Sequence, residues 1–192
     1  MARWIRSARL VARSRKESGA VSVEAALVTP LLVLLVFGII EFGMYYKDAI
    51  VISSMSRTGV RTISAEPRLA SQFTDTVNAI TTAVGSASAG SVKELWIYDA
   101  GTNGFPKGQS GFTTCTNCLR YTWNGTTFTP VAGYTWDPLL QNACPADPLH
   151  TSVGVYVKAD HKFVTGLFPG TLSTSDHSVM RLEPVPVTAG CK

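Results

Sequence analysis

The chain has 192 residues, of which 45% are hydrophobic and 16% are charged, and its formal net charge is +4. Six of its 17 basic residues and one of its 13 acidic residues lie within residues 1–19, which leaves 11 basic and 12 acidic residues for the rest of the chain. Because the larger part of the chain has no basic excess and no basic pattern, its charge argues against nucleic-acid binding.

An apolar segment follows the basic leader. Residues 25–40 contain no charged side chain, and the stretch 20–40 has 21 residues. As a helix this stretch would be about 31 Å long, which matches a bilayer core of about 30 Å. We therefore predict a transmembrane helix over residues 20–46. Its basic flank, residues 1–19, should stay in the cytoplasm and residues 47–192 should face outward.

A secretory signal peptide is the usual explanation for such an N-terminus, but it requires a shorter apolar run and a small-x-small cleavage site. No such site follows Ile40. The order Gly19, then Ala20-Val-Ser-Val-Glu24, then an apolar helix instead resembles the leader of a type IV prepilin. The resemblance implies that a dedicated membrane peptidase cuts between Gly19 and Ala20. It also implies that Glu24 meets the N-terminal amine of a neighbouring subunit.

More narrowly, the stretch Gly19–Pro30, the Leu/Val run and Phe37–Gly43 are similar to the TadE-like minor pilins of tight-adherence (Flp) pilus systems. Ser56–Arg61 resembles a short basic stretch of the same family. The resemblance implies a minor pilin or pseudopilin in the bacterial cell membrane. Its partners would be the prepilin peptidase, other pilins and pilus assembly platform proteins.

Two alternatives stay open at this point. Glu24 also fits the membrane interface of an ordinary anchor, because an acid near a helix N-terminus opposes the positive end of the helix dipole. The whole chain would then be an uncleaved single-pass membrane protein whose outer domain binds a ligand or a surface.

Two helical patterns follow in residues 47–90. The first is a stripe of small and apolar residues that ends before Pro67, since the residue preceding a proline disfavours helix; it comprises Ala49, Ile52, Ser56, Gly59 and Ile63. The second is the apolar face of an amphipathic helix, comprising Leu69, Phe73, Val77, Ile80 and Val84. We expect this extracytoplasmic segment to be helical.

Residues 91–192 change to strand patterns. Branched and aromatic residues predict strands over 92–98, 119–123, 126–129, 153–157 and 178–183. Asn124-Gly125 is a strong hairpin signal between the second and third of these. A helix pair followed by antiparallel strands predicts an α+β fold with one modest core.

Four cysteines, Cys115, Cys118, Cys144 and Cys191, lie in the part expected outside the membrane, which favours disulfides. Three pairings are possible and the sequence does not choose among them. We favour pairing Cys115 and Cys118 with Cys144 and Cys191, because a bridge from Cys115 to Cys118 closes a very small loop.

No catalytic, cofactor or metal motif is recognised in the sequence, so we expect neither enzymatic activity nor a bound cofactor or metal. Asp160-His161 and Asp176-His177 resemble acid–base pairs. However, neighbours on a strand point to opposite faces of a sheet. We interpret His150, His161 and His177 as surface loop residues.

Overall fold

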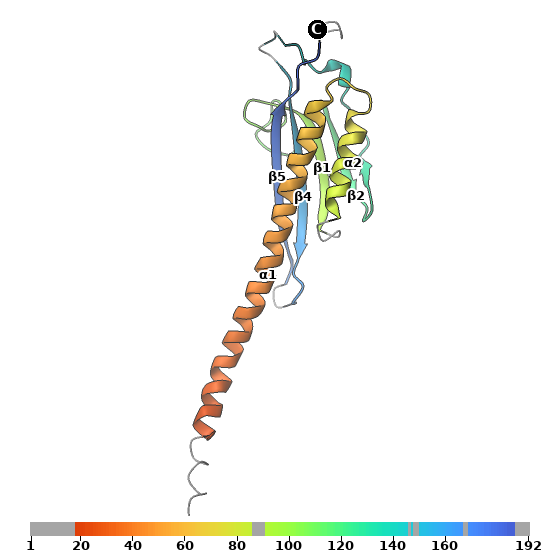
Figure 1. The fold of residues 1–192 in the computed structure, drawn as a ribbon. Coiled ribbons are helices and arrows are strands. Elements are labelled where there is room, and N and C mark those ends of the chain that lie inside the picture. The colour runs from red at the N-terminus through yellow and green to blue at the C-terminus, as the bar shows by residue number, and fades with distance from the viewer. Residues whose placement is uncertain (1–17, 86–90, 146, 148–149, 167–168, 187–192) are drawn as a thin grey trace, which may run out of the picture. The chain divides into compact units, whose positions relative to one another are not determined.

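The computed structural model describes residues 18–85, 91–145, 147, 150–166 and 169–186. It contains two α-helices and five strands. Figure 1 shows the course of the chain through them. The elements are α1 (Ser18–Ala65), α2 (Gln72–Val84), β1 (Val92–Ala100), β2 (Cys118–Trp123), β3 (Phe128–Pro130), the 3-10 turn η1 (Pro138–Leu140), β4 (Ser152–Lys162) and β5 (Thr171–Arg181). The predicted α+β class is confirmed.

The chain divides into two compact units, unit 1 (Met1–Phe42) and unit 2 (Gly43–Lys192). The described part of unit 1 is the N-terminal half of α1, which runs through Pro30 without interruption. Unit 2 holds the C-terminal half of α1, α2 and all strands. The segment predicted as 47–90 therefore belongs to the same compact unit as the sheet.

The strands of unit 2 form one antiparallel sheet in the order β3-β2-β1-β4-β5. β4 and β5 pair over 11 residues without a register shift, and both are longer than the predicted strands. β2 and β3 form the predicted hairpin, in which Gly125 has a φ of 106°. Asn124 N donates to the carbonyl of Thr127 at 3.1 Å, so Gly125 is the first central residue of this turn, a position where a positive φ favours glycine.

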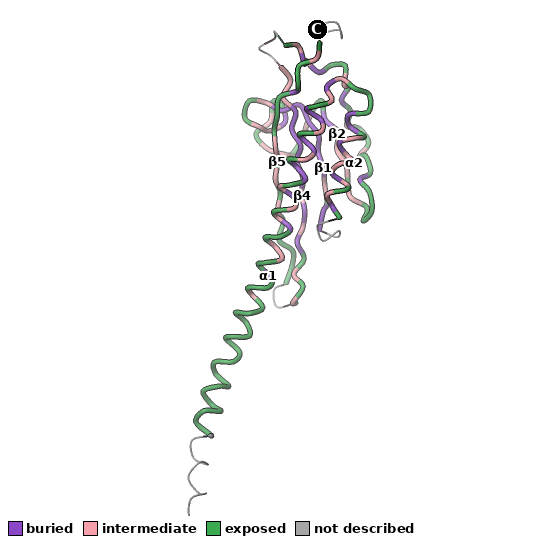
Figure 2. The backbone as a smooth tube through the Cα atoms, viewed as in Figure 1, coloured by how far each residue is buried: buried purple, intermediate pink, exposed green. Residues whose placement is uncertain are grey.

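One face of the sheet packs on the helices. Leu95 and Ile97 of β1 and the alternate residues of β4 from Val153 to Ala159 are buried with α1 and α2 in one aliphatic core. Gly59 of α1 permits this packing, because a Cβ there would overlap Ile80 of α2 and crowd Val155 of β4. Figure 2 shows the buried residues of unit 2, in purple, along the strands and along parts of both helices.

The second helix differs from its prediction at the start. Leu69 precedes α2 and is 52% exposed. Arg68, directly after Pro67, has a φ of 63°, a left-handed conformation that turns the chain out of the helix. Gln72 and Thr76 are buried in place of Leu69, and Thr76 Oγ1 donates to the carbonyl of Gln72 at 2.7 Å.

The opposite face of the sheet carries an aromatic cluster, defined here as Trp96, Tyr98, Phe105, Phe112, Tyr156 and His177. The loop from Gly101 to Asn117 covers it. Phe112 stacks on Tyr156 with ring centroids 3.9 Å apart, and Tyr98 Oη donates to the carbonyl of Gly104 at 2.8 Å. Unit 2 therefore has a buried layer on each side of its sheet.

Candidate functional site

The N-terminal half of α1 exposes apolar side chains. Its exposed large hydrophobic residues are Val21, Val23, Leu27, Val28, Leu31, Leu32, Val33, Leu34, Leu35, Val36, Phe37, Ile39, Ile40 and Phe42. Within the described ranges one helix, Gly19–Ala65, is long and apolar enough to cross a membrane. An apolar surface of this extent is suited to a bilayer or to partner helices.

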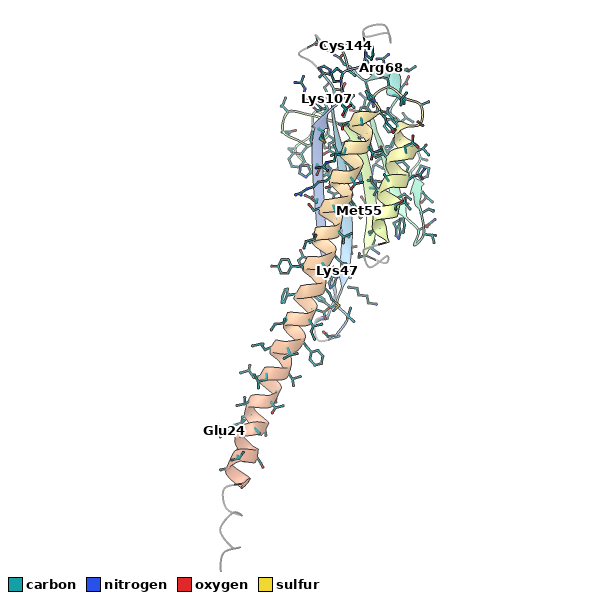
Figure 3. The ribbon with its side chains drawn as sticks, viewed as in Figure 1. Glu24, Lys47, Met55, Arg68, Lys107 and Cys144 are labelled. Atoms are coloured by element: carbon teal, nitrogen blue, oxygen red, sulfur yellow. A yellow bond between two sulfur atoms is a disulfide. The ribbon has the colours of Figure 1, made fainter. Side chains whose placement is uncertain are left out.

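Gly19, Ala20 and Glu24, the residues predicted for processing and assembly, lie in the first turns of α1 and are all exposed. Glu24 is labelled in Figure 3. Ala20 and Glu24 are four residues apart, which makes them neighbours on one face of the helix. The first turns thus combine an accessible peptide bond with a nearby carboxylate.

Arg57 and Arg61, in the predicted basic stretch, are both exposed on α1 within unit 2. They line a shallow groove of about 460 Å³ together with Ile50, Ser53, Ser54 and Thr58. The two arginines therefore lie on a solvated face of α1. Its other side is buried, since Ser56 Oγ donates to Asp176 Oδ2 of β5 at 3.1 Å.

The surface-loop interpretation of the histidines is wrong for His161, which is buried on β4. His177 is exposed as predicted, but it lies on β5 and not in a loop. His161 is buried and its Nδ1 lies 2.8 Å from Oδ2 of Asp48 on α1. Two sequence signals point to this pair. Asp48 extends the α1 stripe one turn back from Ile52, and His161 extends the inward alternation of β4 one step beyond Ala159.

The favoured pairing of the cysteines is also wrong. Cys115 is bonded to Cys118, and their Cα atoms are 6.1 Å apart, within the usual range for a disulfide. The small loop closes because Asn117 adopts a left-handed φ of 53°, which reverses the chain between the two cysteines. Cys144 is disulfide-bonded too, and Cys191 lies outside the described residues.

Arg120 was not recognised from the sequence. Its guanidinium lies over the Trp96 ring, 4.0 Å from the centroid, and Nη1 donates to Tyr134 Oη at 2.7 Å. Glu94 Oε2 accepts from Trp96 Nε1 at 3.1 Å and lies 3.5 Å from Arg120 Nη2. These contacts fix the second face of the sheet. No sequence signal marks them, because they depend on the register between β1 and β2.

No group of three or more potential metal ligands lies together among the residues that the structure describes.

The fold and the exposed helix define a protein with one candidate membrane helix joined to an α+β unit. Residues 19–61 match the family model described as TadE-like protein. The resemblance predicted from the sequence is confirmed over these residues. No curated protein and no solved structure matches the chain.

The matched segment ends inside unit 2. It covers the apolar half of α1 and continues to Arg61, four residues before the helix ends. It contains Gly19, Ala20 and Glu24, as well as both arginines of the exposed α1 face. The match and the apolar helix together indicate a membrane protein associated with a tight-adherence pilus system.

Proposed function

We propose that this chain is a minor pilin or pseudopilin of a tight-adherence pilus assembly or secretion apparatus, without catalytic activity of its own. The observation that carries the proposal is the match of residues 19–61 to the TadE-like family, over the apolar helix that carries Gly19, Ala20 and Glu24. The proposed partners are the prepilin peptidase, other pilins and the assembly platform proteins.

In the proposed mechanism the chain first lies in the membrane with residues 1–19 in the cytoplasm and unit 2 outside. Cutting after Gly19 leaves the apolar helix on the mature protein, where it serves as membrane anchor and later as assembly surface. The new amine on Ala20 would lie one helical turn from Glu24. A carboxylate and an ammonium at that distance attract each other within one chain. In a filament, Glu24 of one subunit and the Ala20 amine of a neighbouring subunit would attract each other in the same way.

The test is the N-terminus of the mature protein. Full-length protein is purified from its native membrane, and its intact mass and N-terminal peptide are determined. We expect the chain to begin at Ala20. A Gly19→Val variant should keep the leader, because it changes the residue on which cleavage depends. The matched control Gly43→Ala, whose added Cβ would meet no atom within 4 Å, should be cut normally.

Two other results would contradict the proposal. A mature chain that retains Arg3 to Lys16 would make the protein an uncleaved single-pass anchor, and unit 2 would then be its functional part. A cut after the apolar run would make unit 2 a secreted protein.

A further inference from the structure

A cavity of about 680 Å³ opens at the end of the sheet where β1 and β5 finish and β4 begins. One wall is a row of directly opposed residues, Ala100, Ser152 and Arg181, on β1, β4 and β5. Directly opposed residues share a face of the sheet. Because Ala100 and Ser152 are small, and Gly101 and Gly108 stand beside them, the row leaves a hollow under the arginine.

The other wall is the loop from Gly101 to Gln109, which its own hydrogen bonds hold in shape. Gly101 N donates to the carbonyl of Phe105 at 2.8 Å, and Asn103 Nδ2 donates to the carbonyl of Gln109 at 2.8 Å. Lys107 N donates to the carbonyl of Asp99 at 2.9 Å, which ties the loop to β1. A preformed wall lowers the entropy cost of binding a ligand.

The charges around the cavity favour an anion. Lys107 Nζ lies 3.7 Å from Asp99 Oδ2, so these two opposite charges largely compensate. Within the described residues the guanidinium of Arg181 has no hydrogen bond or ion pair. His150 Nδ1 donates to the carbonyl of Asp147 at 3.1 Å, so Nε2 of the neutral ring is left as an acceptor for a ligand hydroxyl and not as a donor to the anion. Figure 3 places Lys107 at the same end of unit 2 as Arg68 and Cys144.

The uncharged lining favours a ligand rich in hydroxyl groups. Thr102, Asn103, Gln109, Thr151 and Ser152 supply hydroxyls and amides that donate and accept hydrogen bonds. Among the described lining residues, the largest aliphatic side chain is that of Ala100.

We propose that this cavity binds a small carboxylate that also carries hydroxyl groups, the chemical class of the sugar acids. Arg181 binds the carboxylate through its planar pair of N–H donors, and the hydroxyl and amide side chains bind the ligand's hydroxyls. The volume lies in the usual range of ligand sites, about 300–1,000 Å³. The inference goes beyond the proposed function, since it requires neither cleavage at Gly19 nor pilus assembly.

The test uses the full chain in lipid nanodiscs, titrated calorimetrically with sodium glucuronate. We expect saturable binding that Arg181→Gln weakens at least about tenfold, because a charged hydrogen-bond pair is lost. The matched control Arg61→Gln removes an exposed arginine from α1 and should leave binding unchanged. Gln109→Ala should weaken the binding of glucuronate but not the binding of acetate. Because Gln109 lies outside β5, this variant still tests the proposal if Arg181→Gln disturbs the fold of β5.

Acetate and glucose each carry half of the proposed chemistry, and both should bind at least about tenfold more weakly than glucuronate. If acetate bound as tightly as glucuronate, the cavity would be a simple anion site. If glucose bound as tightly, Arg181 would have no role in binding. Either result overturns the proposal, and so does the absence of saturable glucuronate binding. The ligand could be a free sugar acid or part of a polysaccharide, and a glucuronate tetrasaccharide distinguishes these two sources. Tighter binding of the tetrasaccharide than of glucuronate would identify a polysaccharide as the ligand, and weaker binding would identify a free sugar acid.

Discussion

Asp48 and His161 form a buried hydrogen bond, 2.8 Å long, between residues 113 positions apart in the sequence. Their side chains are 1% and 4% exposed. Tyr45 and Phe163 place their rings edge-on to the imidazole, with centroids 5.9 and 5.8 Å away. The pair therefore joins α1 to the end of β4 in surroundings that exclude water. In such surroundings a hydrogen bond is strong, and a buried polar group that has lost its hydrogen-bond partner destabilises the fold.

Replacing Asp48 with alanine should lower the free energy of unfolding of unit 2 by about 3 kcal/mol, because His161 would be left buried without this acceptor. The measurement is urea unfolding of the full chain in detergent, followed by tryptophan fluorescence. Trp96 and Trp136 are both buried in unit 2 and report on its unfolding.

Asp160→Ala is the control for this variant, since Asp160 precedes His161 on β4 and is only half-buried; it should change stability by less than about 0.5 kcal/mol. The double variant Asp48→Leu with His161→Leu should recover most of the loss, because removing both partners leaves no unpaired polar group. Equal losses in Asp48→Ala and Asp160→Ala would contradict a special role for the pair.

Gly154→Ala should destabilise unit 2 by about 1–3 kcal/mol through overpacking. Gly154 lies opposite Tyr98 in the sheet, and a Cβ there would overlap the Tyr98 ring. That ring cannot move aside easily, because it is fully buried and its hydroxyl donates to the carbonyl of Gly104. The control Gly111→Ala adds a Cβ with no atom within 4 Å and should be nearly neutral in the same urea experiment. A Gly154→Ala protein as stable as wild type would show that the ring relocates.

The sequence predicted those parts of the fold that depend on local pattern. The α1 stripe from Ile52 to Ile63 and the Asn124-Gly125 turn carry their structural signal within a few residues, and both predictions are confirmed. The ends of β4 and β5 were missed, because the polar residues of β5 are in strand only through pairing with β4. Their own side chains give little sign of it.

The candidate sites divide in the same way. Gly19, Ala20 and Glu24 lie within six residues of one another, so their proximity follows from the sequence alone, while their roles stay a prediction. The sheet-end cavity was not predicted, because it joins Ala100, Ser152 and Arg181 through the register of three strands. The disulfide prediction was wrong because it rested on loop length alone, and the left-handed conformation of Asn117, which lets this short loop close, is not visible in the sequence.

Peptide mapping under non-reducing conditions should find Cys115 joined to Cys118. Replacing both with serine should lower the free energy of unfolding by about 2 kcal/mol, the entropy that a four-residue loop removes from the unfolded chain. The bridge joins the loop that covers the aromatic cluster to β2, where Cys118 is buried opposite Tyr98. Finding Cys115 or Cys118 linked to Cys144 instead would restore the pairing favoured from the sequence.

The stability of unit 2 should depend on the ionisation of Asp99. Burial raises the pKa of this carboxyl above its ordinary value of 3.8, and the nearby Lys107 and Asn117 offset part of the shift. Between the unfolded and folded pKa values the folded state binds more protons, so this group's contribution to stability falls as pH rises. Asp99→Asn does not ionise and should gain stability relative to wild type from pH 3.8 upward, levelling off above the folded pKa.

Urea unfolding at a series of pH values measures this difference. Lys107→Gln is a matched variant that should increase the pH dependence of stability, whereas Asp99→Asn should remove it. Without the attraction of Lys107 the pKa of Asp99 should rise further, and the loss of stability with pH should extend to higher pH. An Asp99→Asn difference that is the same at every pH would rule out this linkage.

Glu24→Gln should prevent the protein from entering filaments while leaving it in the membrane and correctly cut after Gly19. The change keeps the size and hydrogen-bonding capacity of the side chain but removes the charge that would attract an N-terminal amine. Filaments are sheared from cells and the sheared and membrane fractions are compared, with Glu183→Gln, at an exposed acid of unit 2, as the control. We expect wild type and the control in both fractions, and Glu24→Gln in the membrane alone. If Glu24→Gln sheared off with the filaments as wild type does, the charge of Glu24 would have no part in assembly, and the acid would only oppose the helix dipole at the start of α1.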